Sequence, residues 1–444
     1  MKKISIKICV FGIIIFLLGS TTTVSSNILT TQKLTPKVSS NELNTLSTPD
    51  PTKIAQAIAM VNETLIRGFL ENLTAFGSRC TGTYGCEKAA EYLFKQLDGM
   101  GLETRYQDWA SFNTRLLHPR YYKSENVEGT LIGKDPSSEE LIFNGHYDSA
   151  KVSPGANDDG SGIAALLAAA YVLSNFEFNR TIKFVAFSGE EQGLLGSRAY
   201  AKEAYENNEK ILVEFNADMI GYAETAQGGR NIALSSTEDA AWAVNKIKGV
   251  NENYSIFSNV NKGWKMIQGG PRMGSDYHDF LLYGYESVAF WQSGHNAKYY
   301  HTSEDTIEHV NFSYLANATK LIVGSLAYLA DMENEYPQVK IGAPRRGSLY
   351  FEDRVPKVFK YEKTIVIDDI LIRAEVTPGN APIEKVEFYY NGKLKYTDTD
   401  APYQWRLNQL SLLRHKITVI AYDTLGRTTS DEMKFFFINL NKKR

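Results

Sequence analysis

The sequence has few cysteines, no long apolar segment beyond its N-terminus and no strong excess of either charge. Its 444 residues include 3 cysteines, and 48 basic against 51 acidic residues give a net charge of −3. A nearly balanced charge without a lysine- or arginine-rich run lacks the electrostatic footprint of a nucleic-acid-binding protein. Because no later segment reaches the ~20 apolar residues of a spanning helix without charges, a polytopic membrane protein is not expected.

The composition is that of a globular protein with more than one domain. Hydrophobic residues make up 43% of the chain and charged residues 22%. These values exclude a wholly disordered, collagen-like or low-complexity protein. Since a typical domain has ~100–200 residues, this length predicts two or more domains.

The N-terminus has the layout of a secretory signal peptide. Lys2, Lys3 and Lys7 precede the apolar run Ile8–Leu18, and small residues follow from Gly19. The run is shorter than a spanning helix, so we expect residues 1–26 to be a cleaved signal peptide and no stable membrane span. The protein is then secreted or otherwise extracytoplasmic, with the cell surface included. An uncleaved N-terminal anchor is the alternative.

Two cysteines remain after such a leader. Cys80 and Cys86 lie six positions apart, with Gly82 and Gly85 between them to let the backbone turn. Outside the cytosol an even pair of this kind indicates a disulfide, which we predict here. Two unpaired, buried cysteines are the alternative.

Residues 51–335 have the pattern of an α/β domain. They follow residues 27–50, a segment rich in Ser, Thr, Asn and Pro that we expect to be a flexible extension. The apolar runs Leu141–Phe143 and Ile182–Phe187 are separated by a helical stretch, Ile163–Leu173. Near-continuous apolar strands divided by helices predict a mostly parallel central sheet sandwiched by helices.

The pattern changes after residue 335. We predict a linker at 336–362 and a separate domain at 363–444, where apolar residues recur at every second position. Val386, Phe388 and Tyr390 share one face before the turn Asn391–Gly392. Short strands with turn signals every ~8–12 residues predict an all-β, immunoglobulin-like sandwich. We expect it to be a spacer or stabilising accessory, with cell-surface or glycan contact as the alternative.

Acidic and histidine side chains follow the ends of the predicted strands in the α/β domain. They are His146, Asp148, Asp158, Glu190, Glu191, Asp218 and His301. In open α/β sheets ligands bind outside the carboxyl ends of the strands, so these side chains can converge. Two histidines and three carboxylates suit Zn²⁺, and a carboxylate between two ions lets five side chains hold a pair. Two ions would activate a water, and one of two adjacent glutamates can face that water while the other ligates.

The segments around these residues resemble the motifs of secreted two-zinc aminopeptidases. The five motifs are His146–Ser149, Pro154–Gly162, Gly189–Ser197, Asn216–Gly221 and Tyr300–Thr306. They occur in the family's order, and the resemblance runs from about Gly77 to about Met332. Glutaminyl cyclases are relatives of the same fold. The C-terminal sandwich looks like the bacterial immunoglobulin-like modules appended to exported hydrolases.

The resemblance implies a role for each site residue. It assigns one zinc ion to His146 and Asp218, the other to Glu191 and His301, a bridging position to Asp158 and the general base to Glu190. It further implies that Asp148 orients His146, that Tyr300 donates a hydrogen bond to the tetrahedral intermediate, and that the peptide bond after Asp158 is cis. Met219, Phe290 and Trp291 are candidates for an apolar substrate pocket, with core packing as the alternative.

Together these observations predict an exported zinc metallo-aminopeptidase that hydrolyses unblocked N-terminal residues from peptides. Its expected cofactor is a pair of Zn²⁺ ions, and its expected partners are peptides with a free N-terminus. One departure from the family is Ser275-Asp276-Tyr277, where Ser-Asp-His is frequent, so His278 receives no metal role. The alternatives are a glutaminyl-peptide cyclotransferase, a carboxypeptidase variant of the same fold and a non-catalytic surface binding protein.

Overall fold

The computed structural model describes residues 49–113, 120–135, 139–223, 225–266, 274–293, 298–333, 336–353, 357–358 and 364–440. The predicted signal peptide and all but the last two residues of the predicted extension lie outside these ranges. Among the described residues, no helix combines the length and the apolar character that crossing a membrane requires.

An eight-stranded mixed sheet forms the centre of the N-terminal domain, with strand order β1-β2-β4-β3-β5-β8-β6-β7. The strands are β1 (Glu103–Asn113), β2 (Arg120–Leu131), β3 (Glu140–His146), β4 (Ile182–Phe187), β5 (Ile211–Ala217), β6 (Asn231–Ser236), β7 (Asn259–Lys265) and β8 (Ser287–Gln292). The central strands β4, β3, β5 and β8 run parallel, whereas β1, β2 and β6 pair antiparallel with their inner neighbours. The predicted α/β class is confirmed.

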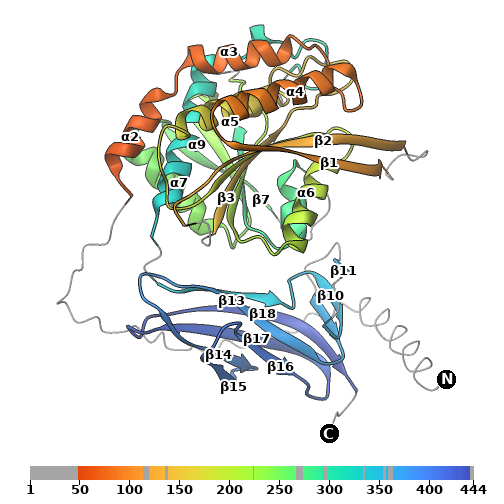
Figure 1. Cartoon of the computed structure of the whole chain (residues 1–444), viewed down its shortest axis with the longest axis vertical. Helices are drawn as coiled ribbons and strands as arrows, with labels where there is room; N and C mark the ends of the chain where they lie inside the picture. Colours follow the sequence, from red (N-terminus) through yellow and green to blue (C-terminus); the bar gives the residue numbers. More distant parts are fainter. Residues whose placement is uncertain are drawn as a thin grey trace. The chain divides into compact units, whose positions relative to one another are not determined.

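Helices cover both faces of the sheet because the central strands are apolar on both sides. Leu141 and Phe143 share one core with α5 (Gly160–Leu173), whereas Ile142 shares another core with α6 (Leu195–Glu206). This division follows from the alternation of side chains along a strand. The first core also takes in α2 (Pro51–Met60), α3 (Glu63–Thr74), α4 (Tyr84–Gly99), α7 (Ala241–Tyr254) and α9 (Phe312–Asp331), and the second takes in α8 (Tyr277–Leu282) (Figure 1).

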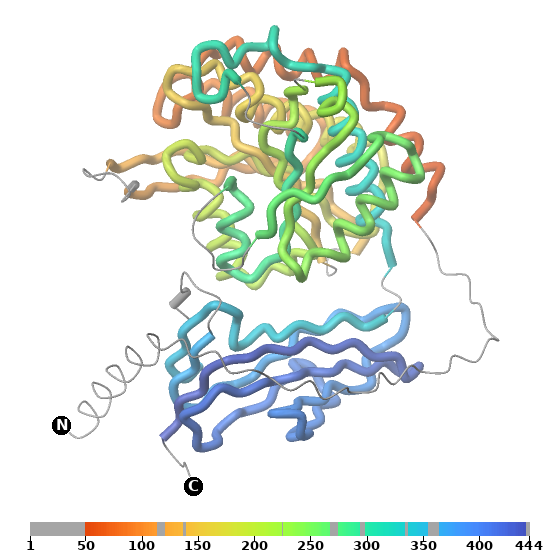
Figure 2. Tube along the Cα trace, turned by 180° about the vertical axis from the view of Figure 1, so that it is seen from behind, coloured from red at the N-terminus to blue at the C-terminus, as the bar shows by residue number. Residues whose placement is uncertain are grey.

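The first and last helices of this domain lie side by side although they are distant in the sequence. Figures 1 and 2 show α2, near the red end of the colour scale, next to α9, coloured cyan. The Lys53 ammonium of α2 donates a hydrogen bond to the carboxylate of Asp331, the last residue of α9. The α/β domain is therefore closed by contact between its two ends.

The C-terminal domain is an all-β sandwich of a seven-stranded sheet, β11-β10-β12-β18-β17-β14-β15, and a three-stranded sheet, β16-β13-β9. Its strands are β9 (Gln338–Ala343), β10 (Ser348–Phe351), β11 (Lys357–Val358), β12 (Thr364–Ile367), β13 (Ile370–Thr377), β14 (Ile383–Tyr390), β15 (Lys393–Asp398), β16 (Gln404–Leu407), β17 (Ser411–Asp423) and β18 (Thr428–Asn439). Val386, Phe388 and Tyr390 are buried in its core, so the predicted face and fold class are confirmed.

The predicted linker at 336–362 is wrong in its described part. Strand β9 pairs antiparallel with β13, and β10 pairs parallel with β12. Val339 and Ile341 of β9 belong to the sandwich core. Pro344 ends this alternation after a few residues, which is too short a run to stand out in the sequence. The sandwich therefore begins at Gln338.

Candidate metal centre

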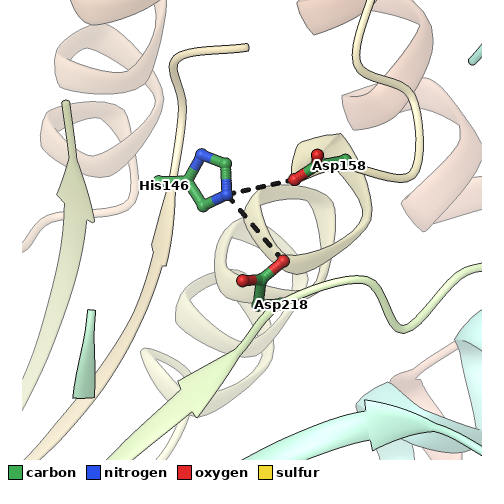
Figure 3. Close-up of side chains that lie close together, drawn as sticks. All are labelled: His146, Asp158 and Asp218. Atoms are coloured by element: carbon green, nitrogen blue, oxygen red, sulfur yellow. Dashed lines mark ion pairs between the residues drawn. The ribbon is translucent and has the colours of Figure 1, made fainter. Parts of the chain in front are cut away.

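The five predicted ligands lie at the carboxyl ends of the parallel strands. His146 is the last residue of β3, Asp218 directly follows β5, and Asp158 lies in the loop before α5. Figure 3 shows these three side chains pointing toward one another. Glu191 follows β4, and His301 lies in the loop before α9. Parallel strands end at one edge of a sheet, which is why residues so distant in the sequence meet here.

The five side chains form two groups of three that share Asp158. In the first group His146 Nε2 lies 3.2 Å from Asp158 Oδ1 and 3.8 Å from Asp218 Oδ1. In the second group His301 Nε2 lies 3.1 Å from Asp158 Oδ2 and 3.1 Å from Glu191 Oε2. Within each group the candidate ligand atoms all lie within 4.8 Å of one another. Because each oxygen of Asp158 faces a different group, this carboxylate can bridge two ions.

The donor atoms of the cluster fit zinc ions. Four of these buried atoms have no hydrogen-bond partner among the described residues: His146 Nε2, Asp158 Oδ2, Glu191 Oε1 and Asp218 Oδ1. A buried polar group without a partner costs about 1–3 kcal/mol, which bound cations would offset. One imidazole nitrogen and two carboxylates per group are ligands that Zn²⁺ accepts.

The electrostatics of the cluster are dominated by the close contact of imidazoles with carboxylates. Burial alone would lower the pKa of His146, but Asp148, Asp158 and Asp218 raise it well above its ordinary value. The carboxylates of Asp158 and Glu191, each 3.1 Å from Nε2 of the ring, raise the pKa of His301 to about 10. Burial would raise the pKa of Asp158, but the two histidines lower it to about 2. Since only a neutral imidazole ligates, metal binding here releases protons.

Asp148 contacts both His146 and the glutamate pair. His146 Nδ1 lies 3.1 Å from the main-chain oxygen of Asp148 and 3.6 Å from its carboxylate. The carboxylate accepts the main-chain N–H groups of Glu190 at 3.2 Å and Glu191 at 3.3 Å, and the Thr81 hydroxyl at 3.1 Å. The main-chain oxygen thus orients the imidazole, while the carboxylate orients the turn that carries the glutamates.

Glu190 lies beside the metal groups but belongs to neither. Burial raises the pKa of its carboxyl well above the ordinary value, although His146 opposes the shift. The preceding Gly189 has φ +77°, and a Cβ there would lie 2.7 Å from the Trp109 ring. Glycine is therefore required at the turn that carries Glu190 and Glu191.

Tyr300 and the candidate pocket residues differ in their surroundings. The Tyr300 ring is 48% exposed and stacks on His301 with a centroid separation of 3.7 Å. Met219 directly follows Asp218 and is half-buried, whereas Trp291, also half-buried, packs against the small cluster of Met266, Tyr277, Leu281 and Ala289. Phe290 is fully buried and packs edge-on against Phe215 in the core, so its side chain does not reach the site.

Trp264 was not predicted as a site residue. It is 48% exposed, and its ring lies 4.6 Å from the ring of Trp291. It lies in β7, at the opposite edge of the sheet from β1 and far from every motif in the sequence. No local signal could have identified it, because its proximity to Trp291 arises only from strand order.

The predicted disulfide is wrong: Cys80 and Cys86 are both free. Cys86 lies in the first turn of α4, which directs it inward to within 3.9 Å of Ser124 Oγ, and burial raises its pKa to about 12. Cys80 precedes the helix, and its sulfur accepts a hydrogen bond from Gln192 at 3.7 Å. The start of the helix between them turns the two side chains toward different neighbours.

The Asp158–Asp159 peptide bond is cis, as the resemblance implied.

The paired three-ligand groups at the carboxyl ends of the parallel strands form a candidate two-metal site on an α/β domain. Residues 126–326 match the family model of Peptidase family M28, and residues 361–419 match the Bacterial Ig domain model. These two segments of the chain are thus similar to Peptidase family M28 and to bacterial Ig domains, respectively. A protein of Pyrenophora tritici-repentis (strain Pt-1C-BFP) described as a probable zinc metalloprotease is 25% identical over 359 residues, covering 65% of this chain and 82% of that protein.

Individual aminopeptidases are similar to the N-terminal part of this chain in sequence or in fold. Aminopeptidase YwaD of Bacillus subtilis (strain 168) is 31% identical over 245 residues, covering 52% of this chain and 50% of YwaD. The chain therefore spans half the length of this relative. An aminopeptidase structure from Aneurinibacillus sp. strain AM-1 has a TM-score of 0.54 at 18% identity, covering 62% of this chain and 96% of that one.

A glutaminyl cyclase of Fimbriiglobus ruber shares the fold as well. Its structure has a TM-score of 0.52 at 18% identity and covers 60% of this chain and 95% of that chain. At such identities the structural matches show the fold alone, because one fold hosts several chemistries.

Proposed function

We propose that this protein is an exported aminopeptidase that uses two zinc ions to remove N-terminal residues from peptides with a free N-terminus. The observation that supports this most is the division of five ligands into two groups that share Asp158. A one-ion site would not need a complete second group. The similarity to an aminopeptidase over half of the chain supports the same substrate class.

The reaction we propose assigns separate tasks to Glu190 and Tyr300. When bound, the ions would polarise the scissile carbonyl and lower the pKa of a water. Glu190, which is not a ligand in this scheme, accepts the proton from the water and passes it to the leaving amine. Its main-chain N–H is held by Asp148, which fixes its position. Burial raises the pKa of Tyr300, so its hydroxyl stays protonated and donates to the developing oxyanion.

The surroundings of the first group favour an apolar substrate side chain. Met219 directly follows Asp218, and the main-chain N–H of Gln292, the neighbour of Trp291, bonds to the main-chain oxygen of Met219. Met219 and Trp291 are both half-buried, so their exposed parts are the apolar surface that we propose for the substrate side chain. We therefore expect a preference for apolar N-terminal residues.

The test is a panel of aminoacyl reporter substrates, free and acetyl-blocked, with and without a chelator. We expect cleavage of the free substrates only, loss of activity with the chelator and recovery on addition of zinc. Equal cleavage of acetyl-blocked substrates would rule out an aminopeptidase and favour the carboxypeptidase variant.

Glutaminyl cyclisation is the second candidate because the fold matches a glutaminyl cyclase. The two reactions differ in product: the peptidase releases an amino acid, whereas the cyclase releases ammonia from an N-terminal glutamine. The complete second group of ligands favours the peptidase. Assaying both products with a glutaminyl peptide separates them.

Export is proposed from the signal-like N-terminus and from the C-terminal domain, since bacterial Ig domains are consistent with extracellular proteins. We propose that this domain acts as a spacer or stabilising accessory. Fractionation of cells that express the full chain tests export: recovery outside the cytoplasm is expected, and retention in the cytoplasm would contradict it.

A further inference from the structure

Two buried carboxylates next to the metal groups, Asp159 and Asp305, accept main-chain N–H groups from the segments that carry the ligands. Asp159 is fully buried and Asp305 is 3% exposed. Neither belongs to a ligand group. Both lie inside the motifs quoted above, yet the sequence suggested no role for either.

Asp305 connects the bridging ligand with the loop of His301. Its Oδ1 accepts the N–H of Asn157 at 2.9 Å, and its Oδ2 accepts the N–H of Asp158 at 3.1 Å. Its main-chain oxygen accepts the N–H of Ala156 at 3.0 Å. Because Asp305 follows His301 by four positions in the same loop, these bonds tie together two of the three ligand segments of the second group.

Asp159 makes the equivalent connection in the first group. Its Oδ2 accepts the N–H of His146 at 3.2 Å, and its Oδ1 accepts the N–H of Met219, the neighbour of Asp218, at 3.2 Å. Oδ1 also accepts the N–H of Gly162 at 2.8 Å. A Cβ at position 162 would lie 2.4 Å from the Asp159 carboxylate, so the glycine leaves room for it.

Arg79 completes this arrangement from the other side of the loop that joins His146 to Asp158. Its guanidinium is fully buried and donates to the main-chain oxygens of Tyr147, Pro154 and Gly155. Asp305 lies close enough to Arg79 to interact with it electrostatically. The loop is thus held by donors and acceptors that do not depend on a bound ion.

We propose that Asp159 and Asp305 are positioning residues that fix the main chain of the metal ligands before ions bind, each serving mainly one group. The inference rests on the proposed two-ion centre. Hydrogen bonds to a charged acceptor are stronger than neutral ones, so each carboxylate can hold segments that would otherwise have to be ordered by the ion. Partners behind the ligands typically change metal affinity by ~10–100-fold.

The test compares D159N and D305N in full-length, metal-free protein titrated with zinc by calorimetry. Asparagine keeps the shape but turns an NH₂ group toward a main-chain N–H, so at least one bond is lost in each variant. Two backgrounds separate the groups: H301N removes a ligand of the second group, and H146N removes a ligand of the first.

We expect D159N to weaken zinc binding ~10–100-fold in the H301N background and D305N to weaken it less there. In the H146N background we expect the reverse order. The matched control is D423N, because Asp423 is a fully buried aspartate of the sandwich that accepts the N–H groups of Leu425 and Arg427. The loss of these hydrogen bonds in D423N should lower the melting temperature without changing the affinity for zinc.

Unchanged zinc affinity in both variants, or the same order of effects in both backgrounds, would overturn the proposal. Circular dichroism and the melting temperature of the metal-free protein check folding. If D305N does not fold, D305E, which keeps both oxygens on a longer side chain, replaces it with the same expectation. If the wild-type chain binds a single ion, the proposed two-ion centre is wrong. The positioning role is then tested on that one ion: weaker zinc binding in D159N or D305N supports it, and unchanged binding in both variants contradicts it.

Discussion

The substitution Glu190→Gln tests the proposed base with little disturbance of the site. Glutamine keeps the size of the side chain but cannot accept a proton from water. Glu190 belongs to neither ligand group, and the bond from its main-chain N–H to Asp148 is unaffected by the change. Both zinc ions should therefore remain bound in E190Q.

The expected loss of activity follows from the task that Glu190 performs. A positioned general base contributes ~10²–10⁴ to the rate, and E190Q should lower kcat by that factor. This corresponds to about 3–5 kcal/mol of transition-state stabilisation. The assay is steady-state hydrolysis of a free aminoacyl reporter, with metal content measured on the same sample. E71Q is a control, since the Glu71 side chain is exposed, forms a surface ion pair with Arg67 and lies far in the sequence from the sheet edge that carries the ligands.

Two results would refute this reasoning. Turnover of E190Q within threefold of wild type, with two ions bound, would exclude Glu190 as the base. Loss of an ion from E190Q would show that Glu190 is a ligand, which contradicts its separation from both groups.

Three further predictions follow from the same structure. Tyr300→Phe should lower kcat ~10-fold or more at unchanged metal content, because one oxyanion donor is lost; unchanged kcat excludes that role. Chelation should lower the melting temperature, since ions at a thousandfold excess over Kd stabilise by about 4 kcal/mol; an equal melting temperature with and without metal contradicts a site in the folded state. Burial raises the pKa of Glu214 to about 8, so this carboxyl is neutral in the folded protein but ionises near pH 4.5 when unfolded, and its contribution to stability falls as pH rises from 4.5 to 8. Glu214→Gln should remove this dependence, which is measured as the difference in the free energy of unfolding between pH 5 and pH 8.5. The same difference in the wild-type protein and in E214Q would refute the prediction.

The convergence of the five candidate ligands could be predicted from the sequence because each stands in a local motif after a strand of the sheet. His146 and Asp218 adjoin apolar runs that form β3 and β5. Their convergence then follows from parallel strand order, a general property of such sheets. The period of two around Phe388 likewise indicated the buried face of the sandwich.

The failed disulfide prediction and the choice between pocket and core for Phe290 both depended on where a side chain points after folding. The spacing of Cys80 and Cys86 allows a disulfide, but the start of α4 directs Cys86 into the core. Phe290 lies near the site in sequence, yet it faces the inner side of β8 and packs against Phe215. The sequence holds no signal for either orientation. Each depends on which face of the helix or strand turns toward the core when the domain folds.

The roles inferred for Asp159 and Asp305 were hidden for a different reason. Asp159 caps α5 through Gly162, a local contact that explains an aspartate at this position without any further function. Its bonds to His146 and Met219 arise only when three segments meet. Contacts of this kind leave no pattern of residue types at the donating end, because every residue except proline has a main-chain N–H.

The most direct test of the account is a crystal structure of the zinc-loaded protein with anomalous data at the zinc edge. The account predicts two peaks, one between His146, Asp158 and Asp218 and the other between Asp158, Glu191 and His301, with Glu190 outside both coordination shells. A single peak, or peaks away from these residues, would contradict it.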